Sequence, residues 1–142
     1  MYHSFINVIM KIFEKIPLIV LISLIITSCM GPLMEQDDGS TIELSENTPF
    51  EIKLKGLPDS PLVWKPYDYD KTVIKLLSGP DISEFNENGA AIKTFEFEFQ
   101  TIASGETILE MVLIPSDETD GIPAKTFEVK VISGTMGRIE AN

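Results

Sequence analysis

Histidine and cysteine are almost absent from this sequence of 142 residues, which holds one of each, His3 and Cys29. A serine–histidine–aspartate triad and a cysteine–histidine dyad both need a histidine beside the nucleophile. Zinc sites usually take histidine or cysteine ligands, and a single cysteine cannot form an intramolecular disulfide. Both residues lie before or at the end of a short apolar N-terminal segment, so its removal would leave no histidine. We therefore expect a protein that is not an enzyme, with no metal and no cofactor.

Basic residues are also scarce. Lysine and arginine number 11 against 22 aspartates and glutamates, a formal net charge of -11. Nucleic-acid binding needs a basic surface that displaces counterions, and anionic lipid headgroups attract basic segments. The charge balance therefore excludes nucleic acid as a partner and excludes direct attraction to anionic lipid. The length allows one ordinary domain after a short leader.

Long apolar runs are limited to one stretch, Ile16 to Ile26, which is shorter than the ~20 residues of a membrane-spanning helix. It follows a basic start at Met10 and ends at small residues, as a secretory signal does. The end, from Ile26 to Cys29, is similar to the lipobox of bacterial lipoproteins, in which the cysteine is acylated and the chain is cut before it. An ordinary signal with a fortuitous cysteine is the alternative, and translation starts at Met1 or Met10.

These features predict four regions in the chain. We expect a signal peptide over 1–28, then acylated Cys29 and a flexible tether over 29–39. A folded domain follows over 40–133, and a tail over 134–142 is expected to fray. The resemblance to lipoproteins implies a protein anchored by lipid in the bacterial cell envelope, at the periplasmic face or at the cell surface.

The folded region has the two-residue periodicity of β-strands. Phe50, Ile52 and Leu54 alternate with charged residues, and so do Phe95 and Phe97, so each segment has one buried face. Turn residues separate the segments, and no helical stripe follows Cys29. The pattern predicts an all-β, immunoglobulin-like antiparallel β-sandwich. We expect strands over 41–45, 50–55, 62–64, 71–77, 95–99, 107–114 and 127–131, with breaks that include Ser78-Gly79-Pro80, and we expect Trp64 in the core.

The order of segments over about residues 41–133 resembles the chagasin-like inhibitors of papain-family cysteine proteases. Their first loop reads Asn-Pro-Thr-Thr-Gly-Tyr-x-Trp, and residues 57–64 keep its proline and tryptophan at Pro58 and Trp64, with Ser60 in place of a threonine. Their second loop is glycine-rich, and residues 88–91 supply one glycine before an aromatic strand. Their third loop reads Arg-Pro-Trp, and residues 114–116 keep the proline.

The resemblance implies a reversible inhibitor whose three loops, at one end of the sandwich, insert into the protease cleft. Two prolines in a six-residue turn also stiffen the first loop, which lowers the cost of ordering it on binding. The implied partner is a cysteine protease, and we expect a monomer. The residues expected to contact the protease are Pro58, Asp59, Ser60, Pro61, Leu62, Asn88, Gly89, Ala90, Pro115 and Ser116.

A second function stays open at this point. An immunoglobulin-like envelope lipoprotein without catalytic activity could bind a protein or a glycan instead. The aromatic and acidic stretch Tyr67–Asp70, or one face of a sheet, would then carry the binding. Substitutions at Ser60, Leu62 and Pro115 distinguish the two, because they weaken an inhibitor and leave an adhesive module unchanged.

Overall fold

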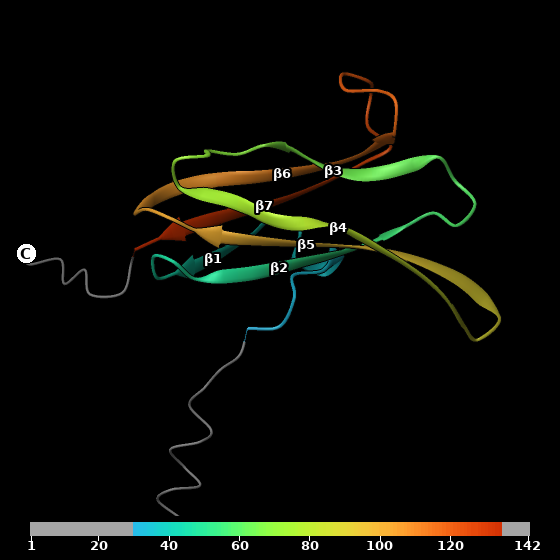
Figure 1. The fold of residues 1–142 in the computed structure, drawn as a ribbon, viewed down its shortest axis with the longest axis horizontal. Helices are drawn as coiled ribbons and strands as arrows, with labels where there is room; N and C mark the ends of the chain where they lie inside the picture. The colour runs from blue at the N-terminus through green and yellow to red at the C-terminus, as the bar shows by residue number, and fades with distance from the viewer. Residues whose placement is uncertain (1–29, 135–142) are drawn as a thin grey trace, which may run out of the picture. The chain divides into compact units, whose positions relative to one another are not determined.

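The alternating segments form seven strands in two sheets in residues 30–134, the part of the chain that this computed structural model describes (Figure 1). The expected signal peptide, Cys29 and the tail beyond residue 134 lie outside the described residues. The strands are β1 (Ser40–Leu44), β2 (Pro49–Gly56), β3 (Leu62–Asp68), β4 (Ile74–Glu87), β5 (Ala90–Thr101), β6 (Gly105–Pro115) and β7 (Lys125–Ser133). One sheet has the order β1-β7-β6-β3 and the other has the order β2-β5-β4. The all-β sandwich is confirmed.

The core forms where the apolar faces of the two sheets meet. In the three-stranded sheet, Phe50 and Ile52 of β2 stand opposite Phe99 and Phe97 of β5, and the rings of Phe50 and Phe99 stack with centroids 5.7 Å apart. All four are at most 3% exposed. The other sheet contributes alternate residues of its strands, and these are Leu109, Met111, Leu113, Phe127, Val129 and Val131, together with Trp64 of β3. Cross-strand packing of this kind is the main source of stability in a sheet.

Strand β4 is longer than the sequence pattern indicates. The expected break at Ser78-Gly79-Pro80 does not end the strand, which continues to Glu87 along β5. Two register shifts, between Leu76 and Ser78 and between Ser78 and Asp81, absorb the irregular residues as bulges. A proline is tolerated there because β4 is an edge strand, so one side of its backbone needs no ladder partner.

One strand pair departs from the antiparallel arrangement that the sequence predicts. Strand β1 pairs with β7 in parallel, with Ile42 opposite Val131, while the other strand pairs are antiparallel. Between them the chain crosses to the other sheet and returns twice, so a two-residue hairpin is not required. The alternation of residues 41–45 identifies the strand but carries no signal for its direction.

The segment before β1 is not a free tether in the part that the structure describes. The N–H of Leu33 donates to the carbonyl of Glu51 and its carbonyl accepts from Lys53, each at 2.8 Å, so Leu33 adds a short parallel bridge to β2. Leu33 is 6% exposed. The 3-10 helix η2 (Glu35–Asp37) follows, and Asp38 accepts a hydrogen bond from the N–H of Glu128 at 2.7 Å. No helix in residues 30–134 is long and apolar enough to cross a membrane.

We expect Leu33→Ala to lower the free energy of unfolding by about 2–3 kcal/mol, because a buried leucine loses its transfer energy and leaves a cavity. Leu77→Ala is the matched control, since Leu77 is 42% exposed, and should cost under about 1 kcal/mol. Urea unfolding of residues 30–142 measures both. Equal losses for the two variants would mean that Leu33 is not part of the core.

Candidate functional site

Three loops lie at the same end of the sandwich (Figure 1). We call them loop 1 (residues 57–61, between β2 and β3), loop 2 (residues 87–90, the β4–β5 turn) and loop 3 (residues 116–124, between β6 and β7). Leu62 at the start of β3 pairs with Pro115 at the end of β6, so loops 1 and 3 leave from neighbouring strand ends. Gly56 ends β2 opposite Lys93, and the β4–β5 hairpin extends beyond it to loop 2. The strand register therefore gathers all three loops.

Loop 1 is a tight turn with several conformational restraints. Pro58 and Pro61 each fix one φ angle, and Asp59 between them has φ of 54°, a left-handed conformation that aspartate tolerates better than most residues. The hydroxyl oxygen of Ser60 accepts the N–H of Leu62 at 3.2 Å. A turn restrained in this way loses little conformational entropy when a partner binds.

The base of loop 1 is fixed by Trp64. Its indole N–H donates to the carbonyl of Lys55 at 2.9 Å, so the bond links β3 in one sheet to β2 in the other. Gly56 lies next to this carbonyl, where a Cβ atom would stand 2.5 Å from the ring of Phe95. The close approach of β2 to that ring therefore requires glycine. Trp64 is 2% exposed, so its role is to hold the loop and not to contact a partner directly.

Loop 2 is the two-residue turn of a long hairpin. Asn88 and Gly89 have φ of 51° and 80°, and positive φ at both central positions is typical of the type I′ turn that suits the twist of a hairpin. Behind the turn, Lys93 forms an ion pair with Glu84 at 3.7 Å. The hydroxyls of Ser83 and Thr94 share a hydrogen bond across the strands. These contacts connect β4 and β5 at the point where β2 ends, and the hairpin continues beyond them to the turn as two strands.

Loop 3 is held at both of its ends. The ammonium group of Lys65 in β3 donates to the carbonyls of Ser116 at 2.9 Å and Glu118 at 3.3 Å. At the other end, the N–H of Ala124 donates to the carbonyl of Leu113 at 2.9 Å. The loop is therefore attached to β3 and β6, although it has no regular secondary structure.

Loop 3 also folds back over the outer face of its sheet. Along β6, residues that point into the core alternate with residues that point away from it, and Val112 and Ile114 point away. Each is nevertheless only 3% exposed. A hollow beside them is lined by Tyr67, Glu110, Thr119, Gly121 and Pro123 as well. Loop 3 therefore covers apolar surface and has a small packing base of its own.

The residues predicted from the sequence to contact a protease fall into two groups by exposure. Most of them are exposed and available to a partner. The other three, Ser60, Leu62 and Pro115, are half-buried and lie at or near the strand ends. Lys65 and the exposed Ile122 of loop 3 were not predicted from the sequence. No local signal marks Lys65, because its carbonyl partners are more than fifty positions away in the chain. The exposed group consists of Pro58, Asp59, Pro61, Asn88, Gly89, Ala90 and Ser116.

The stretch Tyr67–Asp70 does not form one continuous surface. The ring of Tyr69 packs edge-on against Phe99 with centroids 5.8 Å apart, so it belongs to the edge of the core. The carboxylate of Asp70 accepts two hydrogen bonds from Thr72, from the hydroxyl at 2.6 Å and from the N–H at 2.8 Å. These bonds, the hydroxyl bond first, hold the pKa of Asp70 below its ordinary value. Asp70 thus fastens a turn, and Tyr67 remains exposed.

The lowered pKa of Asp70 predicts a pH-dependent effect of Thr72→Val. A carboxyl group with a lower pKa in the folded state stabilises the fold above its unfolded pKa, and this contribution disappears as the pH falls through the folded value. We expect Thr72→Val to be less stable than the parent at neutral pH, with the difference shrinking as the pH falls below 3.8, the ordinary pKa of an aspartate. Chemical denaturation at several pH values measures it.

The matched control for that experiment is Thr126→Val, an exposed threonine of β7. Its effect on the free energy of unfolding should not change with pH, because the Thr126 hydroxyl is not bonded to any carboxylate of residues 30–134. A pH-independent loss in Thr72→Val would contradict the assigned role of the Asp70 carboxylate.

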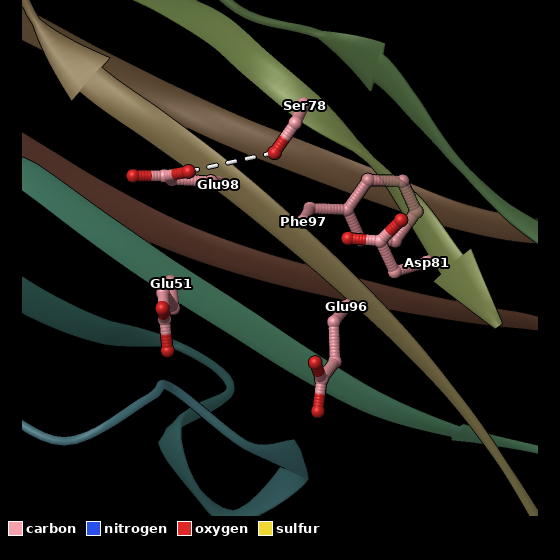
Figure 2. A pocket seen from close by; sticks show the side chains of 6 residues that line it. All are labelled: Glu51, Ser78, Asp81, Glu96, Phe97 and Glu98. Carbon is pink, nitrogen blue, oxygen red and sulfur yellow. Dashed lines mark hydrogen bonds between the residues drawn. The ribbon is translucent and has the colours of Figure 1, made fainter. Parts of the chain in front are cut away.

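An acidic hollow lies on the outer face of the three-stranded sheet (Figure 2). Glu51 and Glu98 stand directly opposite each other on β2 and β5, and Glu96 forms an ion pair with Lys53 at 2.6 Å. Ser78 and Asp81 of β4 complete the rim. In residues 30–134, no group of three or more acidic, histidine or cysteine residues is placed to hold a metal ion. The carboxylates of a cross-strand pair repel each other, and solvation by water reduces this repulsion. We therefore interpret the acidic hollow as a solvated face of the sheet.

The fold is a β-sandwich with three restrained loops at one end. Residues 43–131 match the family described as chagasin family peptidase inhibitor I42, and the chain belongs to this family. No curated protein matches it in sequence.

Solved structures share the fold at low sequence identity. The cysteine protease inhibitor EhICP2 from Entamoeba histolytica superimposes with a TM-score of 0.62 at 19% identity, over 72% of this chain and 94% of that one. Amebosin, in its solution structure, superimposes with a TM-score of 0.55 at 18% identity, over 72% of this chain and 99% of that one. At such identities the likeness concerns the fold.

Proposed function

We propose that this protein is a reversible inhibitor of papain-like cysteine proteases and that loops 1, 2 and 3 insert into the protease cleft as one wedge. The observation that carries the proposal is the gathering of three restrained loops at one end of a peptidase-inhibitor sandwich. The fold neighbour EhICP2 is itself a cysteine protease inhibitor. Inhibition by blockade needs no catalytic group, in keeping with the scarcity of histidine and cysteine in the chain.

The wedge is stiff for a different reason in each loop. Two prolines and the Trp64 hydrogen bond restrain loop 1, a two-residue turn closes loop 2, and Lys65 holds loop 3. Binding costs free energy for every loop that must be ordered, so a surface that is already ordered retains more of its contact energy as affinity. The exposed prolines and small residues at the tips also let the loops enter a narrow cleft.

Charge indicates the kind of protease that fits. Loops 1, 2 and 3 hold five acidic residues and neither lysine nor arginine: Asp59, Glu87, Asp117, Glu118 and Asp120. Complementary potentials raise the association rate and disfavour partners of like charge. We therefore propose a target whose cleft is rimmed by basic residues.

The proposed location is the bacterial cell envelope, with lipid on Cys29. There the protein would protect the cell from its own exported proteases or from foreign ones. Because Leu33 is bonded to β2, only residues 30–32 separate it from position 29, a span of at most roughly 14 Å. A lipid on Cys29 would therefore keep the sandwich close to the bilayer surface.

The first test is the titration of papain, and then of a panel of bacterial cysteine proteases, with residues 30–142. We expect inhibition that is reversible on dilution and approaches one inhibitor per active site with at least one of these enzymes. Residual activity against a peptide substrate is the measurement. No inhibition of any of them at micromolar protein would refute the proposed function and favour an envelope-binding module.

The second test is a charge reversal in loop 1. Asp59→Lys should slow association with an inhibited protease by about tenfold, and the effect should shrink as ionic strength rises, because it removes attraction to a basic rim. Glu46→Lys makes the same charge change at an exposed position in the turn before β2, at the opposite end of the sandwich, and should alter the rate much less. Stopped-flow association at several salt concentrations measures both. Equal effects of the two substitutions would show that the association rate depends on the net charge of the protein and not on the charge of the loops.

A further inference from the structure

Ile122 of loop 3 is the most exposed large apolar side chain in the described residues. It is 96% exposed, whereas the next values are 58% for Ile108 and Tyr67. An apolar side chain that is this exposed contributes almost nothing to the fold, because folding removes hardly any of its surface from water. A role in folding therefore does not account for its position.

The structure of loop 3 holds Ile122 outward. Its neighbours on both sides, Gly121 and Pro123, line the hollow above Val112 and Ile114, so the side chain between them points the other way. A residue before proline is also restricted to extended conformations, which limits the backbone at this position. The hydrogen bonds at the two ends of the loop fix the platform that carries Ile122.

Two more exposed apolar side chains lie at the same end, one in loop 1 and one in β4 just before loop 2. Leu57 begins loop 1 and is 44% exposed, and Phe85 lies two residues before loop 2 and is 47% exposed. Loop 3 begins with Pro115 and Ser116, and Ser116 has no apolar surface to offer. Loop 1, the end of β4 that leads into loop 2, and loop 3 thus each present one large apolar side chain, and in loop 3 it comes from the distal part of the loop.

We propose that Ile122 is the apolar anchor of loop 3 and determines which proteases the inhibitor binds tightly. The partner surface would be an apolar-walled subsite on the rim of a papain-like cleft. This inference rests on the proposed function and adds a specificity-determining residue to it. Interface energy concentrates in a few side chains that become fully desolvated, and burial of a whole aliphatic side chain corresponds to about ten- to a hundredfold in affinity.

The test compares Ile122→Ser with Ile108→Ser in residues 30–142. Ile108 is the matched control because it is also exposed and lies in β6 near the opposite end of the sandwich from the loops. The inhibition constant is measured for each variant against every protease that the parent inhibits. We expect Ile122→Ser to weaken inhibition by at least about tenfold and Ile108→Ser to leave it within about twofold of the parent. Ile122→Leu should retain most of the affinity.

The possible results separate the inference from the function beneath it. The midpoint of thermal unfolding of each variant should match that of the parent, because the substituted side chains are exposed. A midpoint equal to that of the parent together with weakened inhibition by Ile122→Ser supports the proposal. If the parent inhibits and Ile122→Ser inhibits equally well, Ile122 is not an anchor and the inference fails alone. If the parent inhibits no protease, the proposed function fails and the inference fails with it.

Discussion

The hydrogen bond from the indole of Trp64 to the carbonyl of Lys55 is the contact on which the loop end depends. It joins the two sheets where the chain leaves one for the other, and it sits directly beneath loop 1. The bond satisfies a buried indole N–H, and a buried donor left without a partner costs about 1–3 kcal/mol. The apolar layers give the sandwich its stability, but this bond sets the position of loop 1 relative to the strands that carry loops 2 and 3.

Loop 3 shows how an exposed loop can be stabilised without regular structure. Its underside covers Val112 and Ile114, its ends are tied by Lys65 and by the backbone of Leu113, and its outer side leaves Ile122 free. One face of the loop therefore behaves as part of the protein interior, and the other face is exposed and forms the proposed contact with a protease. Sequence variation on the outer face can change the partner while the packing underneath stays the same, which allows functional sites to diverge on a constant fold.

The sequence predicts the core well because burial imposes a strict two-residue period on β2, β5 and β7. The features that the sequence pattern does not predict have physical causes. The length of β4 depends on pairing with β5, which overrides the local preference of Gly79 and Pro80 to break a strand. The docking of Leu33 and the anchoring of loop 3 by Lys65 depend on partners distant in the chain. The loops themselves are foreseen from prolines and the Asn-Gly pair, whereas the exposure of Ile122 follows from tertiary packing alone.

A protein with one tryptophan carries its own optical reporter, and the position of that tryptophan determines what it reports. Trp64 is 2% exposed beneath loop 1, so its fluorescence senses whether the two sheets are joined there. The indole lies below the tips that would meet a partner. Its emission spectrum therefore reads out the integrity of the scaffold, separately from occupancy of the loop surface, and damage to the fold can be distinguished from loss of a contact in the same sample.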